Sequence, residues 1–157
     1  MPIAVGQQAP QFTLFAAPGE PVNLADYAGK KVALFFLPAV FSGVCTEEVC
    51  DLRDNISSFS SVGAEVLAIT VDGVHANMKF REINNATFPI LSDWDRQVTN
   101  AYDVRWENFA GIEGFHVANR AAFVIGEDGR ILYAWEGEHP GTYPDMAAIQ
   151  AVIHGEG

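Results

Sequence analysis

The stretch KKVALFFLPAVFSGVCTEEVC, residues 30–50, carries the strongest indication of the fold of this chain. Its first part, KKVALFFLP, is a continuous apolar run that ends at Pro38, which is typical of a strand buried on both faces. A helix is expected to follow from residue 45 to about residue 60. Cys45 therefore falls where a buried strand passes into a helix.

The two cysteines of the chain, Cys45 and Cys50, both lie in this stretch. A thiol at a helix start faces unpaired backbone N–H groups and the positive end of the helix dipole. Both favour the thiolate, which is the reactive form of cysteine, so Cys45 is placed as a nucleophile. Ser42, three residues earlier, can hold a substrate oxygen or cap the helix. Pro38 ends the strand and shapes the loop.

The rest of the chain alternates strands and helices. A helical turn is expected near LADYAG, and two β-rich runs flank EDG, which is a hairpin signal. This order predicts an α/β chain with a thioredoxin-like fold, a central mixed sheet flanked by helices. The expected strands are AEVLAITVD (64–72), FPILSD (88–93) and the hairpin RAAFVIGEDGRILYAWEG (120–137); the expected helices are VHANMKFREIN (74–84), WDRQVTNAYDV (94–104) and YPDMAAIQAVIHG (143–155).

Composition and charge argue against a nucleic-acid-binding protein and against a membrane protein. A chain of 157 residues with 49% apolar residues is most simply one domain, residues 1–157, with its own core. The net charge is −11 and the nine basic residues are scattered, so nucleic acid is not expected as a partner. No apolar run is long enough to span a bilayer, so no membrane association is expected. The N-terminus lacks the pattern of a secretory signal, which makes a cytoplasmic location the default expectation.

The histidines give no sign of a metal site. They are widely separated, and none lies at ligand spacing from a cysteine. No metal is therefore expected. The four are His75, His116, His139 and His154.

The spacing of Pro38, Ser42 and Cys45 carries a family resemblance. Pro-x-x-x-Ser-x-x-Cys is similar to the active-site motif of the peroxiredoxins, with serine in place of the commoner threonine. FFLPAVFSGVCTEEVCDLRD resembles the bacterioferritin comigratory protein class, or Q type, of that family. Further matches follow in the family's order along the chain. They are VGQQAPQFTL near the start, FPILSD in the middle, and NRAAFVIGEDGRILYAW, whose Arg120 stands at the position of a catalytic arginine.

The resemblance implies a thiol-dependent peroxidase that needs no cofactor. Cys45 would attack a peroxide oxygen and become a sulfenic acid. Ser42 and Arg120 would bind the peroxide oxygens, and Arg120 would also stabilise the Cys45 thiolate. Glu48 would orient Arg120 through a charge-assisted hydrogen bond. Phe36 and Phe41, on either side of the motif proline, are expected to wall the peroxide pocket.

The role of Cys50 depends on helix geometry. In one straight helix, residues five apart rise about 7.5 Å and point roughly 140° apart. A disulfide needs Cα atoms about 4.4–6.8 Å apart, so Cys45 and Cys50 can bond only if the helix unwinds. The resemblance to the Q type favours Cys50 as the resolving cysteine, which attacks the sulfenic acid and forms a redox-active disulfide.

Other interpretations stay open at this point. Cys50 can be a small core residue in a one-cysteine peroxidase that uses an external thiol, as in relatives of the alkyl hydroperoxide reductase E type, which the run YDVRWENFAGIEGFHVANR also resembles. A non-catalytic redox sensor is a further alternative. A thioredoxin-type reductase is disfavoured because Cys-x-x-Cys is absent. The expected partners are a peroxide and a thioredoxin-like or other thiol reductant, and the sequence leaves monomer and homodimer open.

Overall fold

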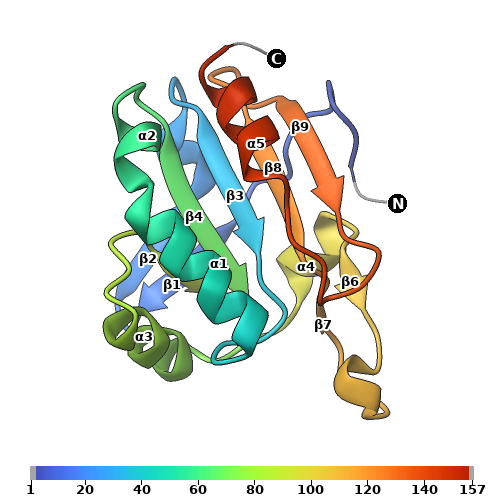
Figure 1. The fold of residues 1–157 in the computed structure, drawn as a ribbon. Helices are drawn as coiled ribbons and strands as arrows, with labels where there is room; N and C mark the ends of the chain where they lie inside the picture. The colour runs from blue at the N-terminus through green and yellow to red at the C-terminus, as the bar shows by residue number, and fades with distance from the viewer. Residues whose placement is uncertain (1–2, 156–157) are drawn as a thin grey trace.

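The computed structural model describes residues 3–155 and has a mixed sheet as its centre (Figure 1). The inner strands β3, β4 and β5 run parallel, and β1, β2, β8 and β9 extend the sheet on both sides by antiparallel pairing. This confirms the predicted α/β class with a mixed sheet. In sheet order the strands are β2 (Glu20–Asn23), β1 (Thr13–Ala17), β5 (Ile90–Ser92), β4 (Glu65–Thr70), β3 (Val32–Phe36), β8 (Ala121–Ile125) and β9 (Ile131–Glu136).

Strand β3 lies inside the sheet, between β4 and β8, and every residue in it is buried. Its side chains alternate between the two faces of the sheet, as strand geometry requires. Leu34 and Phe36 pack into one core, with Tyr102 and Phe123, whereas Phe35 packs into the other. The continuous apolar run in the sequence therefore serves two separate cores.

Helices cover both faces of the sheet. Helices α1, α2, α3 and α5 contribute to the core that contains Phe35, while α4 and the 3-10 helix η1 contribute to the opposite core. Figure 1 shows α1, α2 and α5 in front of the sheet and α4 behind it. The helices are α1 (Gly43–Asp54), α2 (Ile56–Ser60), α3 (Val74–Ile83), α4 (Gln97–Ala101), α5 (Met146–Ile153) and η1 (Leu24–Tyr27).

The first helical region differs from the single helix expected at residues 45–60. Helix α1 begins two residues earlier, at Gly43, and ends at Asp54, where Asn55 separates it from α2. The Asn55 side-chain amide donates to the Asp51 carbonyl oxygen at 2.8 Å. Asparagine favours helix ends because its side chain competes for backbone groups in this way.

A smaller unit extends from the sheet between α4 and β8. It consists of β6 (Arg105–Trp106), the 3-10 helix η2 (Phe109–Gly111) and β7 (Val117–Ala118). In Figure 1 the segment with η2 projects away from the sheet. Over residues 3–155, no helix combines the length and apolar character that crossing a bilayer requires.

Candidate active site

The loop between β3 and α1 is anchored by contacts with the end of β4 and with α3. Pro38 is buried at its start. The Val40 N–H donates to the Asp72 carboxylate at 3.0 Å. Phe41 has a φ of 65°, which is costly for a bulky residue, and its ring packs edge-on against Phe80 of α3. These contacts hold the loop in a conformation that its own sequence disfavours.

Ser42 occupies the N-cap position of α1, but its side chain does not cap the helix. The hydroxyl donates to the Ala39 carbonyl oxygen at 2.9 Å. The carbonyl of Ser42 instead accepts the N–H and the hydroxyl of Thr46, both at 3.0 Å. Of the two interpretations open for Ser42, side-chain capping is therefore wrong.

Cys45 meets Arg120 and Glu48 in a buried cluster. One guanidinium nitrogen of Arg120, Nη2, donates to the Cys45 sulfur at 3.1 Å, and Nη1 donates to Glu48 Oε1 at 2.8 Å. Cys45 and Glu48 are 0% exposed and Arg120 is 1% exposed. In this low-dielectric setting the guanidinium stabilises negative charge on the sulfur far more than it would in water.

Glu48 is incompletely satisfied. Among the described residues, its second carboxylate oxygen, Oε2, has no hydrogen-bond partner. Burial raises the pKa of Glu48 to about 7, although its ion pair with Arg120 acts to lower it and the nearby Asp51 carboxylate raises it further. Glu48 thus changes charge near neutral pH while it stays in contact with Arg120.

The position of Arg120 depends on the strand ends around it. Asn119 accepts the Arg120 N–H at 2.9 Å through its side-chain oxygen, and its amide nitrogen donates to the Gly137 carbonyl at 2.7 Å. Gly137 N–H donates to the Arg120 carbonyl at 2.9 Å. The remaining guanidinium nitrogen, Nε, donates to the Pro140 carbonyl at 2.9 Å. The side chain is therefore fixed at all three of its nitrogens.

Gly137, whose backbone contacts Arg120 and Asn119, packs closely against Thr142 and His139. A methyl group added there would overlap the Thr142 hydroxyl and reach 3.1 Å from the His139 carbonyl oxygen. We expect Gly137→Ala to lower the free energy of unfolding by about 1–3 kcal/mol, as overpacking usually does. Urea titration measures this. Gly43→Ala is the matched control, because its added methyl meets nothing within 4 Å, and an equal effect of the two changes would contradict the prediction.

Cys50 lies on a different face of α1 from Cys45. Its sulfur contacts the side-chain oxygen of Asn84, at the end of α3, at 3.5 Å. Cys50 is partly exposed, Cys45 is buried, and both are free thiols. The intact helix therefore separates the two cysteines, as its geometry predicts.

The predicted residues thus divide into groups. Arg120 contacts both Cys45 and Glu48, and Pro38 and Ser42 lie in the adjoining loop. The expectation for Phe36 is wrong: it packs against Tyr102 and Phe123 in the opposite core, because alternation along β3 turns it away from the cysteine. Phe41 remains at the loop, 52% exposed.

Three supporting residues were not found from the sequence. Asn119 and Asp72 carry no motif of their own, although Asn119 directly precedes Arg120. Pro140 acts through its backbone carbonyl, which leaves no side-chain signature. Within residues 3–155, no three His, Cys, Asp or Glu side chains are grouped so as to hold a metal ion.

Comparison with known proteins agrees with this geometry. Residues 5–134 match the family model described as the AhpC/TSA family. A putative peroxiredoxin of Mycobacterium tuberculosis is 40% identical over 129 residues, 82% of each chain, and peroxiredoxin Bcp of Bacillus subtilis is 34% identical over 142 residues, 86% of each chain. The crystal structure of peroxidoxin BcpB from Mycobacterium tuberculosis superposes with a TM-score of 0.84 at 27% identity, covering 98% of this chain and 97% of that one. The chain therefore belongs to the AhpC/TSA family, among the peroxiredoxins of the Bcp type.

Proposed function

We propose that this protein is a thiol-dependent peroxidase that reduces hydrogen peroxide and organic hydroperoxides through Cys45. The observation that carries the proposal is the buried contact of the Arg120 guanidinium with the Cys45 sulfur at 3.1 Å. A cation fixed beside a thiol favours the thiolate, the form that attacks peroxide. Membership of the AhpC/TSA family supports the same activity.

In the first step, the Cys45 thiolate attacks one peroxide oxygen and the O–O bond breaks. The sulfur becomes a sulfenic acid, and the other oxygen leaves with a proton as water or an alcohol. In this proposal, Arg120 and the first N–H groups of α1 stabilise the charge that develops on the oxygens. We assign Ser42 as a further donor to the peroxide. Its hydroxyl must first release the Ala39 carbonyl oxygen.

Access to the sulfur requires movement. Cys45 is 0% exposed, so the loop that starts at Pro38, or α1 itself, must shift before peroxide reaches it. The strained φ of Phe41 marks that loop as a place where energy is stored.

In the second step, the Cys50 thiol attacks the sulfenic sulfur, forms the Cys45–Cys50 disulfide and releases water. Because both residues lie within α1, at least its first turns must unwind for this to happen. A thioredoxin-like or other thiol reductant would then return the dithiol. The competing possibility is a one-cysteine peroxidase, which the contact of Cys50 with Asn84 at 3.5 Å favours because it holds this thiol away from Cys45.

The experiment is intact-mass measurement of the reduced protein after one equivalent of hydrogen peroxide and a rapid quench. Cys45→Ser and Cys50→Ser are treated in parallel. We expect the parent to lose two hydrogen atoms, and neither variant to do so. Cys50→Ser should instead gain one oxygen atom, since its sulfenic acid has no internal partner.

Other outcomes separate the alternatives. Gain of oxygen by the parent, retained in Cys50→Ser and lost in Cys45→Ser, would indicate a one-cysteine peroxidase. Oxidation without steady turnover when a thiol reductant is supplied would indicate a sensor. No mass change in any of the three proteins would contradict the peroxidase proposal.

A further inference from the structure

The carboxylate of Asp72 fixes one point of the loop that precedes Cys45. Asp72 lies just beyond the end of β4, and its Oδ2 accepts the Val40 N–H at 3.0 Å. Among residues 3–155, this is the only hydrogen bond that joins residues 38–42 to a part of the chain outside the loop and α1. A hydrogen bond to a carboxylate is stronger than one between neutral groups, so this single bond holds the backbone of the loop at Val40.

Asp72 is itself held by three elements. Its N–H donates to the Thr70 hydroxyl oxygen at 3.0 Å, and that hydroxyl donates to the Asn77 side chain of α3 at 2.8 Å. The Asp72 carbonyl oxygen accepts the Ser92 hydroxyl of β5 at 2.6 Å. The ends of β4 and β5, together with α3, therefore determine the position of the carboxylate, and the carboxylate determines the position of Val40.

Next to Val40, the loop adopts a conformation that it would not keep alone. Phe41 has a φ of 65°. A bulky residue strained in this way persists only where its surroundings hold it. The hydrogen bond of Val40 to Asp72 and the packing of the Phe41 ring on Phe80 provide those surroundings. Loss of the hydrogen bond therefore allows Phe41 to relax to an ordinary backbone conformation, which moves Ser42 with it.

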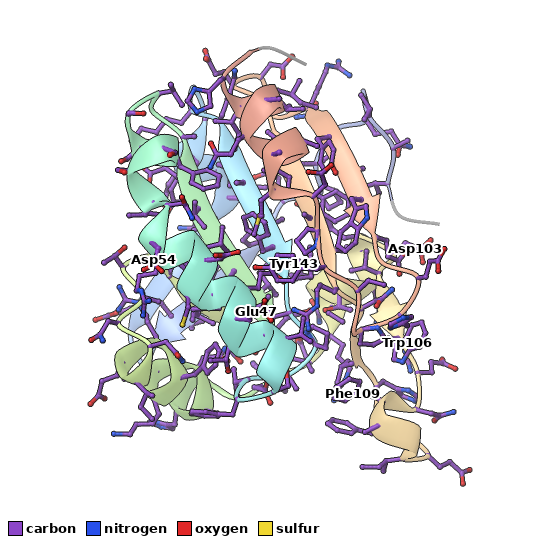
Figure 2. The ribbon with its side chains drawn as sticks, in the orientation of Figure 1. Glu47, Asp54, Asp103, Trp106, Phe109 and Tyr143 are labelled. Atoms are coloured by element: carbon purple, nitrogen blue, oxygen red, sulfur yellow. The ribbon has the colours of Figure 1, made fainter. Side chains whose placement is uncertain are left out.

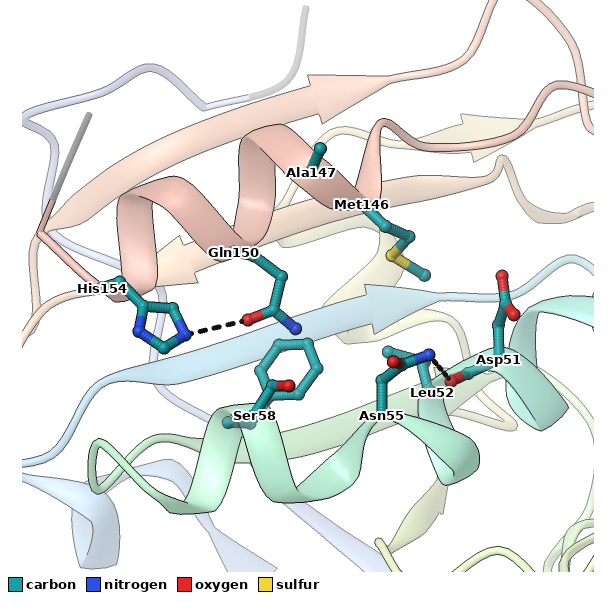
Figure 3. Close-up of a pocket in the computed structure, with 9 residues that line it drawn as sticks. Asp51, Leu52, Asn55, Ser58, Met146, Ala147, Gln150 and His154 are labelled. Atoms are coloured by element: carbon teal, nitrogen blue, oxygen red, sulfur yellow. Dashed lines mark hydrogen bonds between the residues drawn. The ribbon is translucent and has the colours of Figure 1, made fainter.

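The loop is also the segment that can bring a hydroxyl group to the cysteine. Figure 2 shows Glu47 on the face of α1 that is turned to solvent, whereas Cys45 is buried. The groove between α1, α2 and α5 is lined on α1 from Asp51 onward and includes none of residues 38–45 (Figure 3). The sulfur therefore borders neither this groove nor the outer face of the helix. Ser42 carries the one hydroxyl group within residues 38–45.

We propose that Asp72 is a positioning residue for the peroxide reaction: by holding Val40, it places the Ser42 hydroxyl for contact with the peroxide. The inference rests on the proposed function. In that step a bond forms between the Cys45 sulfur and one oxygen, the O–O bond breaks, and the other oxygen leaves with a proton as water or an alcohol. Asp72 acts on this step through the loop alone.

Two reactions of Cys45 separate this role from an effect on the thiolate. Oxidation by peroxide needs donors for the two oxygens. Alkylation by iodoacetamide needs only the thiolate and access to it, since a bond forms between sulfur and carbon and iodide leaves. A change that moves only the Ser42 hydroxyl therefore slows oxidation and leaves alkylation unchanged. A change in the thiolate population, or in access to the sulfur, alters both reactions together.

The test uses Asp72→Ala in a protein that also carries Cys50→Ser, so that Cys45 is the single thiol. Cys50→Ser alone is the reference protein. Each reduced protein is mixed with hydrogen peroxide or with iodoacetamide, and the second-order rate constants are obtained by quenched intact mass. We expect oxidation to slow about tenfold, the change that corresponds to one lost hydrogen bond to a charge. Alkylation should stay within about twofold of the reference protein.

Two further variants make the result specific. Asp72→Asn separates the hydrogen bond from the charge: its side-chain oxygen can still accept the Val40 N–H, so oxidation should return to within about threefold of the reference protein. Asp128→Ala is the matched control, because Asp128 also accepts a backbone N–H, that of Arg130 at 3.1 Å, in the exposed turn between β8 and β9. It should leave both rates unchanged.

A double-mutant cycle tests whether Asp72 acts through Ser42. Ser42→Ala removes the proposed donor and should slow oxidation by itself. With Ser42 already replaced, Asp72→Ala has no hydroxyl left to misplace, so the double variant should be at most about twofold slower than Ser42→Ala. Additive losses would show that Asp72 affects the reaction by another route, which contradicts the inference.

The remaining outcomes are distinct. If peroxide does not oxidise the reference protein, the proposed function fails and the inference fails with it. If the reference protein is oxidised and Asp72→Ala reacts at the same rate, the positioning role is wrong and the peroxidase proposal stands. Faster oxidation together with faster alkylation would mean that the bond to Val40 closes the site, and equal slowing of both reactions would mean a loss of thiolate; either result overturns the inference.

Urea titration establishes that each variant is folded. Asp72→Ser gives the same test should Asp72→Ala not fold, because its hydroxyl oxygen lies one bond closer to the backbone than a carboxylate oxygen and does not reach the Val40 N–H, while serine is favoured before a helix such as α3. The same selective slowing of oxidation is expected for it.

Discussion

Replacing Arg120 with lysine is expected to lower the second-order rate constant for oxidation of Cys45 by peroxide at least about 100-fold. Arg120 uses all three of its nitrogens, on the Cys45 sulfur, on Glu48 and on the Pro140 carbonyl. Lysine is a single point charge and cannot reproduce this planar arrangement. The ammonium would pair with Glu48 and leave both the sulfur and the developing charge on peroxide without their donor.

The measurement is single-turnover oxidation of the reduced protein by hydrogen peroxide. Arg130→Lys is the matched control, because Arg130 is an exposed arginine whose partners, Gly6 and Asp128, lie outside the site. It should react as the parent does. A rate for Arg120→Lys within threefold of the parent, in a protein that remains folded by urea titration, would show that the guanidinium has no part in the reaction.

The pH dependence of stability should report Glu48 directly. The folded-state pKa of Glu48 is about 7, against 4.5 for the free side chain, mainly because it is buried. Between these two values the folded protein binds more protons than the unfolded chain, so the free energy of unfolding falls as pH rises. The stabilising contribution of protonated Glu48 is complete below pH 4.5 and is lost by about pH 8. Its size is about 3 kcal/mol, which corresponds to roughly 100-fold in the unfolding equilibrium.

Urea titrations of the parent and of Glu48→Gln from pH 4.5 to pH 8 test this. Glutamine keeps an acceptor for Arg120 and cannot ionise, so the difference between the two proteins isolates the carboxylate. We expect the parent to lose about 3 kcal/mol more than the variant over this range. Glu47→Gln, an exposed neighbour on the same helix, should follow the parent. The same pH slope in the parent and in Glu48→Gln would mean that Glu48 has an ordinary pKa in the folded protein.

The Glu48 carboxylate affects both the free energy of unfolding and the position of Arg120. Glu48 contacts Arg120, and its Oε2 has no hydrogen-bond partner among residues 3–155. A buried charge that is only partly satisfied costs stability, and removing its counter-ion costs more. The position of Arg120 is therefore maintained at the expense of some folding free energy.

Local pattern determined much of the fold. The apolar run before Pro38 predicted a fully buried strand, and β3 is buried at every position. The hairpin signal at EDG predicted β8 and β9, which pair as expected. These predictions succeed because strand burial and turn geometry depend on residues close in sequence. Element ends were less well predicted. The helix expected at residues 94–104 covers only Gln97–Ala101, since Arg96, with φ of 63°, interrupts the helical backbone before it.

The position of Cys45 as the candidate nucleophile follows from the sequence, because the start of a helix directly after a buried strand is a local feature. The residues that surround Cys45 depend instead on the tertiary structure. Antiparallel pairing of β3 with β8 sets Phe36 opposite Ala121, and this register brings Arg120 beside a cysteine 75 positions away. The support from Pro140 comes from a segment without periodicity, and it is a backbone carbonyl. Such contacts depend on chain path rather than on residue pattern, so the three-dimensional fold alone reveals them.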